Sequence, residues 1–163
     1  MEKWDAYDIN GNRIEGELIR NEPIPNGLYH LVAEVLVYHV EGYYLLVQRD
    51  FDKEVWPGYF EASAGGSALK GENSVAAVKR ELSEETGIVA LSIEEIGELV
   101  TSNIIHKSFI ATCDIPKNSV RLQAGESIAY KWVGKKELID FLNSDECIPS
   151  QRKRLLSFLT EKI

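Results

Sequence analysis

The chain is poor in cysteine and in uninterrupted apolar sequence. Its two cysteines, Cys113 and Cys147, are too few for a disulfide framework and lack metal-ligand spacing, so we expect packing or surface thiols. No apolar run approaches the roughly 20 residues that a membrane-spanning helix needs. The first ten residues also lack the basic-then-apolar pattern of a signal peptide. These absences predict a cytoplasmic protein with no membrane partner.

Basic residues are scarce as well. The 163 residues include 18 Lys and Arg against 26 Asp and Glu, which gives a net charge of −8. Proteins that bind nucleic-acid duplexes usually carry a basic stripe, but the only basic cluster here is Arg152, Lys153 and Arg154. We interpret that cluster as the solvated face of a terminal helix. The composition therefore argues against a nucleic-acid duplex as partner, and a polyanionic small molecule would need local cations.

Hydrophobic periodicity and turn residues predict a mixed order of strands and helices. The Asn-Gly turn at residues 10–12 predicts an N-terminal hairpin, residues 1–20, that extends a single domain spanning 1–163. Its exposed edge could pair across a homodimer. The strands that we expect are 4–9, 13–19, 31–40, 43–48, 88–99, 104–113 and 127–133, with a short strand between the loops at 56–58 and 65–66. The helices that we expect are 73–86, 135–143 and 150–162. This order predicts an α/β fold in which helices cover a mixed β-sheet as an α/β/α sandwich.

Three glutamates share one face of the helix expected at residues 73–86. Glu81, Glu84 and Glu85 are spaced i, i+3 and i+4, so their carboxylates lie within an arc of about 100°. These like charges repel one another, and the C-terminal end of a helix disfavours negative charge. The arrangement is costly unless a cation binds, and oxygen ligands favour Mg²⁺, Mn²⁺ or Ca²⁺. A plain acidic, solvated helix face is the alternative.

The neighbours of these glutamates on the same helix complete its interpretation. Val75, Val78 and Leu82 form an apolar stripe that would pack on the sheet, and Arg80 could pair with Glu84. Either Asn73 or Ser74 could cap the start of the helix, and Gly87 suits its end.

A glycine-rich segment, Ala64-Gly65-Gly66, leads towards this helix. Glycine allows close backbone approach and unusual dihedral angles, and the free amides at a helix N-terminus favour anions. A loop that suits phosphate, followed by a helix rich in carboxylates, indicates metal-assisted phosphoryl chemistry.

Residues 66–88 resemble the complete 23-residue Nudix box, G-x5-E-x7-R-E-U-x-E-E-x-G-U, where U is aliphatic. Every fixed position of the pattern matches. The resemblance extends over about residues 28–158 and implies the Nudix α/β/α sandwich. It also implies Mg²⁺-dependent hydrolysis, with Mn²⁺ possible, of a pyrophosphate bond in a nucleoside diphosphate linked to another moiety, by water that the metal activates.

The resemblance also implies roles for individual residues. Glu81, Glu84 and Glu85 would bind the metal, with the carbonyl group of Gly65 as a further ligand. Glu72 would support the loop or reach the metal through water. Arg80 resembles the arginine that orients the glutamates.

Residues outside the glutamate helix complete the expected site. The phosphates would lie against Gly65 and Gly66, within reach of Arg49 and Lys53. Glu126, six residues before Trp132, is the candidate for a further ligand or general base, with Glu98 as the runner-up and Glu81 as another possible proton acceptor.

Two other functions compete with hydrolysis. The segments 56–58 and 63–66 are similar to the branch nearest isopentenyl-diphosphate isomerase, which transfers protons. That isomerase carries a catalytic cysteine at the position of Gly65 and a metal-binding histidine at that of Ser67, and its box lacks carboxylates at the positions of Glu81 and Glu84. A regulatory Nudix-like domain, which binds nucleotides without turnover, typically loses box glutamates that this chain keeps. Hydrolysis is therefore the function that the residues favour, with the substrate left open.

Overall fold

The structure, a computed structural model, describes residues 1–161. Strands and helices alternate along the chain much as the sequence predicts. The strands are β1 (Lys3–Tyr7), β2 (Arg13–Ile19), β3 (His30–His39), β4 (Tyr43–Arg49), β5 (Phe60–Glu61), β6 (Ala64–Ser67), β7 (Ser92–Thr101), β8 (Ile104–Cys113) and β9 (Ser127–Gly134). The helices are α1 (Ser74–Thr86), α2 (Lys135–Leu142) and α3 (Pro149–Glu161). Residue 162, the last of the predicted final helix, lies outside the described residues.

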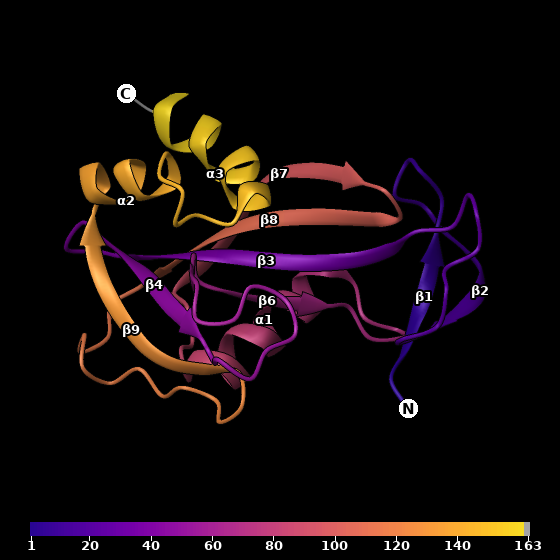
Figure 1. The fold of residues 1–163 in the computed structure, drawn as a ribbon, viewed down its shortest axis with the longest axis horizontal. Helices are drawn as coiled ribbons and strands as arrows, with labels where there is room; N and C mark the ends of the chain where they lie inside the picture. Colours follow the sequence, from indigo (N-terminus) through magenta and orange to yellow (C-terminus); the bar gives the residue numbers. More distant parts are fainter. Residues whose placement is uncertain (162–163) are drawn as a thin grey trace.

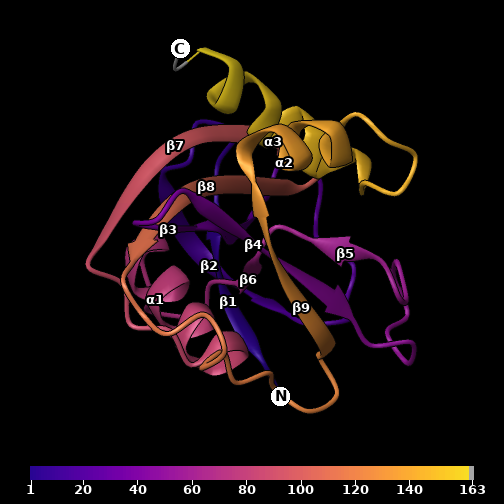
Figure 2. The ribbon, with the colours of Figure 1, turned by 90° about the vertical axis from the view of Figure 1, so that its left-hand side faces the viewer.

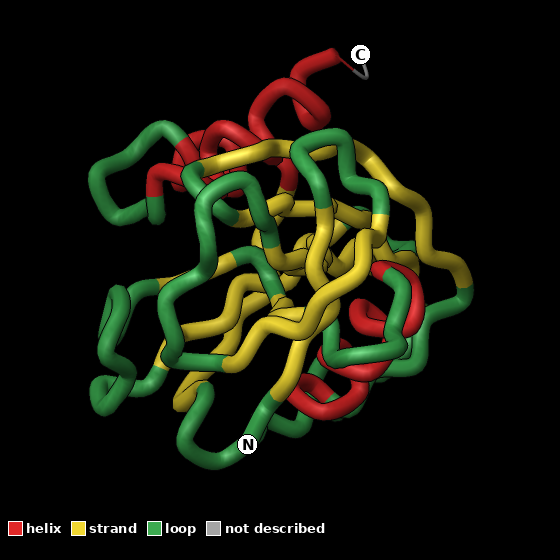
Figure 3. Tube along the Cα trace, turned by 90° about the vertical axis from the view of Figure 1, so that its right-hand side faces the viewer, coloured by secondary structure: helices red, strands yellow, loops and turns green. Residues whose placement is uncertain are grey.

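A mixed sheet forms the centre of the fold. Its main path runs β5-β4-β3-β8-β7, with β6 paired to β3 and β9 paired to β4. The β3–β8 pairing is parallel and continuous from His30↔Ile104 to His39↔Cys113, whereas the other pairings are antiparallel. Helix α1 lies on one face of the sheet, and α2 and α3 lie on the other (Figures 1 and 2). The strands therefore run between two groups of helices (Figure 3), which confirms the predicted α/β/α sandwich with a mixed sheet.

The sheet divides where β4 leaves β3. These two strands pair only near their hairpin, at Tyr38↔Tyr44 and His39↔Tyr43. Beyond that point β6 pairs with β3, while β4 pairs with β5 and β9. A Cβ atom on Gly65 would lie 2.8 Å from the carbonyl oxygen of Ala33, so glycine is what allows β6 to approach β3 here. This fork in the sheet places the glycine segment beside α1.

Two apolar cores hold the layers together. Alternation along β3 directs Ala33, Val35 and Val37 towards α1, where they join the core that includes Val78 and Leu82. Leu36 points to the opposite face and joins the core under α2 and α3. The prediction that Val75 belongs to the α1 stripe was wrong, because its side chain is 42% exposed in the first turn of the helix. Periodicity gives its direction around the helix but not whether another element covers the first turn.

The ends of α1 follow the predicted chemistry. The side chain of Asn73 accepts a hydrogen bond from the backbone N–H of Ala76 at 2.8 Å, and Gly87 ends the helix at φ 72°. The strand predicted at residues 88–99 begins later, at Ser92. Ile88 packs in the core, but Val89 is 80% exposed, so the apolar run after the helix connects α1 to β7 rather than extending the strand.

The predicted N-terminal hairpin is present as a separate two-stranded sheet of β1 and β2. It lies at one end of the molecule (Figure 1) and contacts the segment that precedes α1. The backbone N–H of Gly71 donates to Asp5 Oδ2 at 2.8 Å, and the N–H of Lys70 donates to the carbonyl group of Lys3 at 2.8 Å. Trp4 stacks on His30 with 4.3 Å between ring centroids. The hairpin therefore braces the loop that leads into the glutamate helix.

The interpretation of the basic cluster was wrong for Arg154. Lys153 is exposed as expected, but the Arg154 side chain is only 2% exposed and lies 3.0 Å from Glu34. Helix α3 packs on the sheet through the face that carries Arg154 and Leu155, so one member of the cluster is buried.

Both cysteines are buried, which agrees with packing thiols. Within residues 1–161, every helix is too short or too polar to cross a membrane.

Candidate functional site

A cleft of about 590 Å³ opens beside α1. Its wall includes α1, the glycines of β6, the segment after β4, the segment before β9 and part of the N-terminal hairpin. Among residues 1–161, six glutamates and four basic side chains line it. The lining includes the predicted residues Glu81, Glu84, Glu85, Glu126, Arg49, Lys53, Arg80, Gly65 and Gly66. The structure thus brings together nearly all of the site that the sequence predicts.

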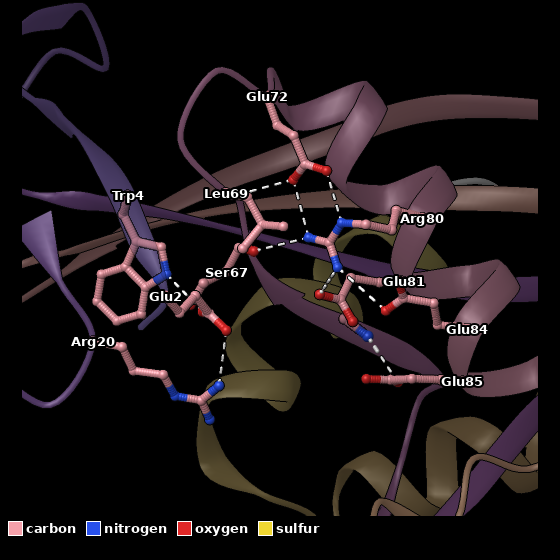
Figure 4. Close-up of polar contacts among 11 residues, drawn as sticks. Glu2, Trp4, Arg20, Ser67, Leu69, Glu72, Arg80, Glu81, Glu84 and Glu85 are labelled. Carbon is pink, nitrogen blue, oxygen red and sulfur yellow. Dashed lines mark hydrogen bonds and ion pairs between the residues drawn. The ribbon is translucent and has the colours of Figure 1, made fainter. Parts of the chain in front are cut away.

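The three helix glutamates differ in burial because they differ in direction around α1. Taking the core-facing Val78 as zero, and 100° per residue, Glu85 lies at about −20°, Glu81 at about −60° and Glu84 at about −120°. Exposure follows this order: Glu85 is 8% exposed, the Glu81 side chain 13% and the Glu84 side chain 48%. Glu85 therefore points inward beneath the cleft, and Glu84 lies at its rim (Figure 4).

Glu85 carries the most unusual electrostatics of the cleft. Burial, followed by the charges of Glu61 and Glu81, raises the pKa of Glu85 to about 9, and Glu126 adds to the effect. The backbone N–H of Gly65 donates a hydrogen bond to Glu85 Oε2, but this bond is long, at 3.3 Å. A carboxylate in this position is disfavoured in its charged form unless a cation offsets it.

Arg80 binds Glu72, Glu81 and Glu84 and so fixes their positions (Figure 4). Its Nε and Nη2 donate to the two oxygens of Glu72 at 2.7 and 3.0 Å, and its Nη1 donates to Glu81 at 2.7 Å. The predicted pair with Glu84 is present but long, at 3.4 Å. Nη2 also donates to the carbonyl group of Ser67. One guanidinium group therefore connects the loop, the helix and two candidate ligands.

Glu72 lies behind this arginine and is not among the residues that line the cleft. Its carboxylate also accepts the backbone N–H of Leu69 at 2.9 Å, and the hydrogen bonds from Arg80 lower its pKa. Glu72 was expected either to support the loop or to reach the metal through water. Its hydrogen bonds match the first of these roles.

Gly65 and Gly66 lie directly against the carboxylates. A Cβ atom on Gly66 would overlap the carboxylate of Glu81, so a larger residue here would displace that carboxylate from its present position. Because β6 carries no side chain here, its backbone forms part of the cleft surface between the glutamates and the rest of the wall.

The cations of the cleft are each paired with an acid. Arg49 Nη1 lies 3.2 Å from Glu61, and Lys53 Nζ lies 2.6 Å from Glu126. Glu126 thus lies in the cleft as predicted. The runner-up Glu98 lies on β7, 3.5 Å from Lys107 and outside the cleft. His106, on β8, is likewise not among the residues that line the cleft, and its ring nitrogens lie near Thr101 and Glu34.

Sequence reasoning missed two contributors to the cleft. Glu61, from the short strand β5, lies in the wall, and burial raises its pKa. The hairpin supplies Trp4 and Arg20, with Arg20 paired to Glu2 at 3.0 Å (Figure 4). No sequence pattern connects these residues to the glutamate helix, because tertiary packing alone brings them together.

The residues of the cleft fit a divalent cation by their chemistry. The candidate ligand atoms are all oxygens. Glu85 is buried among other carboxylates, and its carboxylate accepts a single long hydrogen bond. Across residues 1–161 the acidic, histidine and cysteine side chains do not already converge in threes on one point. Arg80 Nη1 donates to both Glu81 and Glu84, whereas the backbone N–H of Gly65 donates to Glu85, so these bonds hold Glu85 apart from the other two carboxylates.

Comparison with known proteins agrees with this fold. The sequence model of the NUDIX domain matches residues 28–155. An uncharacterised Nudix hydrolase of Listeria monocytogenes is 35% identical over 154 residues, which cover 91% of this chain and 89% of that protein. The chain therefore belongs to the Nudix hydrolase family.

Two further proteins are similar to the chain. An isopentenyl-diphosphate Delta-isomerase of Clavibacter sepedonicus is 28% identical over 120 residues, covering 68% of this chain and 62% of that protein. The crystal structure of DR0079 from Deinococcus radiodurans superposes with a TM-score of 0.76 at 17% identity, covering 94% of this chain and 99% of that one. The latter similarity supports the fold.

Proposed function

We propose that the protein hydrolyses, with Mg²⁺, a pyrophosphate bond in a nucleoside diphosphate linked to another group. The observation that carries this proposal is the position of Glu85, which is buried beside Glu61 and Glu81 and faces a cleft lined by Gly65 and Gly66. A carboxylate is stable in its charged form there only with a cation, and a diphosphate needs the same cation to enter an acidic cleft.

The groups that would hold the cation come from α1 and β6. Glu81, Glu84 and Glu85 would supply carboxylate oxygens, and Gly65 would supply its carbonyl oxygen. Bound Mg²⁺, or Mn²⁺, would neutralise charge on the phosphates and lower the pKa of a water molecule. Arg80, fixed by Glu72, would orient Glu81 and Glu84 for this task.

The remaining cleft residues would position the substrate and accept the proton that the attacking water loses. Arg49 and Lys53 would position phosphate oxygens by exchanging their present partners, Glu61 and Glu126, for the substrate. Glu126, freed from Lys53 in this way, would accept the proton of the attacking water. Glu81 is the other acceptor within the cleft.

The choice of proton acceptor can be tested by paired substitutions. Glu126→Gln is expected to lower kcat about 100-fold, because glutamine cannot take up a proton. Glu98→Gln, the matched control on β7, is expected to leave kcat unchanged because Glu98 lies outside the cleft. Steady-state kinetics with saturating Mg²⁺ measures both. Equal kcat values for Glu126→Gln and the wild type would exclude Glu126 and leave Glu81.

A panel of nucleoside diphosphate derivatives, assayed with Mg²⁺ and read as released phosphate after phosphatase treatment, tests the reaction itself. Hydrolysis that stops with EDTA is the expected result. Isomerisation of isopentenyl diphosphate should be assayed beside it, because a named isomerase is among the similar proteins. The chain has Gly65 and Ser67 where that enzyme type needs a cysteine and a histidine, so we expect no isomerisation. Tight binding without turnover would instead indicate a regulatory domain.

Three wider predictions accompany this function. They are a cytoplasmic location, a single domain with residues 1–20 as an extension, and a homodimer that pairs the hairpin edges. A small-angle scattering mass equal to one chain would contradict the homodimer.

A further inference from the structure

The loop of residues 68–72 joins β6 to the segment that begins α1, and each of its backbone N–H groups has a hydrogen-bond acceptor. Inside the loop, the N–H of Leu69 donates to Glu72 Oε2, and the N–H of Glu72 donates to the carbonyl group of Leu69, both at 2.9 Å. A third N–H donates to β3. The acceptors of the other two belong to the N-terminal hairpin, so the hairpin completes the hydrogen bonding of this loop.

Both hairpin acceptors lie on β1. The carbonyl group of Lys3 accepts from the N–H of Lys70, and Asp5 Oδ2 accepts from the N–H of Gly71, each at 2.8 Å. Gly71 lies at φ 88°, in the left-handed region, so the chain makes a turn there that favours glycine. Asp5 is 8% exposed and is not among the residues that line the cleft. Of the two acceptors, only the carboxylate of Asp5 can be removed by a side-chain substitution.

The hairpin is itself fixed on both sides of Asp5. Tyr7 belongs to the core that packs against α1 and exchanges two backbone hydrogen bonds with Tyr29, at 2.9 and 3.0 Å. Trp4 stacks on His30, the first residue of β3. Because Asp5 lies between these two contacts on one short strand, its carboxylate has a fixed place relative to the sheet.

The loop passes this restraint to the cleft through Arg80. Glu72, the residue after Gly71, accepts from Arg80 Nε and Nη2 at 2.7 and 3.0 Å. Arg80 Nη2 also donates to the carbonyl group of Ser67, just before the loop, at 3.1 Å. Nη1 of the same guanidinium group contacts two of the candidate cation ligands on α1. A shift of the loop would therefore move the arginine that orients those carboxylates.

We propose that Asp5 is a positioning residue of the cation site. It fixes the 68–72 loop at Gly71, and through Glu72 it sets the place of Arg80 and of the glutamates that Arg80 contacts. The fixing of the loop follows from the contacts alone, whereas its effect on cation binding rests on the proposed function. The N-terminal hairpin thus takes part in cation binding without supplying a ligand.

The hydrogen bond to Gly71, rather than the charge of Asp5, carries this effect. The Asp5 carboxylate also lies 3.5 Å from Arg13 Nε, and the Arg13 side chain is 52% exposed. An ion pair of that length and exposure contributes little. Asparagine in place of Asp5 would lose the ion pair but keep an oxygen that accepts from Gly71. It therefore separates the two contacts, whereas alanine removes both.

Calorimetric titration of the metal-free protein with Mn²⁺ tests the role of Asp5 without a substrate. Asp5→Ala should raise the Kd for Mn²⁺ about tenfold, with the number of sites per chain unchanged. Asp5→Asn should stay within about twofold of the wild type, because it keeps the acceptor. Glu17→Gln is the matched control: Glu17 pairs with Lys3 and Lys70 at the exposed side of the same contact, and its loss should leave the Kd unchanged.

Amide hydrogen exchange supplies a second measurement that needs neither cation nor substrate. In Asp5→Ala the N–H of Gly71 loses its acceptor and should exchange faster. The N–H of Leu69 should follow, because its acceptor, the Glu72 carboxylate, is released with the loop. Amides of the β3–β8 ladder should exchange as in the wild type, since the sheet stays folded. Asp5→Asn should restore the exchange rate of Leu69.

An unchanged Kd in Asp5→Ala would overturn the proposal, as would fewer sites at an unchanged Kd, which indicates a folding defect alone. Binding by Asp5→Asn that is as weak as that by Asp5→Ala would also overturn it, by assigning the effect to charge. If the wild type neither binds Mn²⁺ nor hydrolyses any diphosphate, the proposed function fails, and exchange at Leu69 then decides whether Asp5 fixes the loop. Unchanged exchange there would overturn the positioning role regardless of the reaction.

Discussion

Replacement of Glu85 by glutamine is expected to stop turnover and, at the same time, to stabilise the metal-free protein. The neutral amide keeps the size of the side chain but is a poor cation ligand, so kcat should fall about 1,000-fold, equivalent to about 4 kcal/mol. The stabilisation has a different origin: burial, and then Glu61 and Glu81, raise the pKa of Glu85 to about 9 in the folded protein. Turnover within tenfold of the wild type would contradict the proposed mechanism.

The sign of the pH dependence follows from that raised pKa. In the unfolded chain Glu85 ionises near its ordinary value of 4.5, but in the folded, metal-free protein it keeps its proton to about 9. Its contribution to stability is therefore full below pH 4.5 and is lost progressively as the pH rises towards 9. Between pH 6 and 8 the free energy of unfolding should fall by about 3 kcal/mol.

Urea unfolding in EDTA at pH 6 and pH 8 measures this loss. The wild type should show it, and Glu85→Gln should lack it, because glutamine does not ionise. Glu84→Gln is the matched control, since Glu84 is exposed at the cleft rim and its removal should leave the pH dependence of the wild type in place. Saturating Mg²⁺ should also suppress the loss in the wild type. Identical pH dependence in Glu85→Gln and the wild type would show that Glu85 is not the group responsible.

Replacement of Arg80 by glutamine should weaken both the fold and the response to Mg²⁺. The guanidinium group binds Glu72 through two nitrogens, Glu81 through a third, and the carbonyl group of Ser67. Its loss leaves two partly buried carboxylates without a cation, and the free energy of unfolding should fall by about 2 kcal/mol. The Mg²⁺ concentration for half-maximal activity should rise at least about tenfold, because Glu81 and Glu84 lose the group that orients them.

Lys79, the residue before Arg80 on the helix, provides the control. Lys79→Gln removes the same charge from an exposed position of α1 and should change neither quantity. Chemical denaturation and Mg²⁺ titrations of activity measure the two effects separately. A variant that lost stability but kept the wild-type Mg²⁺ dependence would make Arg80 a structural residue only.

The sequence predicts the glutamate helix well because local rules determine it. A cap at Asn73 or Ser74, the stop at Gly87 and the shared face of the glutamates all follow from helix geometry, and the structure shows the cap at Asn73. The direction of Glu85, at about −20° from Val78, even accounts for its burial. The Asn-Gly turn likewise predicts the N-terminal hairpin.

Features that depend on tertiary pairing could not be predicted in this way. The burial of Arg154 depends on how α3 packs on the sheet and on the presence of Glu34 beneath it, and no spacing in the sequence relates these two residues. Glu61 enters the cleft because β5 pairs with β4 after β4 leaves β3. The bond between Arg80 and Glu72 crosses from the helix to the preceding loop, outside the reach of the i,i+4 rule.

The parallel pairing of β3 with β8 has a consequence for how the protein folds. It joins His30 to Ile104 and so encloses the glycine segment and the whole glutamate helix within one long loop of chain. Closing such a loop has an entropic cost that local contacts do not repay, and pairings of this kind form late and slowly. We expect α1 and the β1–β2 hairpin to form early and the cleft to assemble only in the final stage.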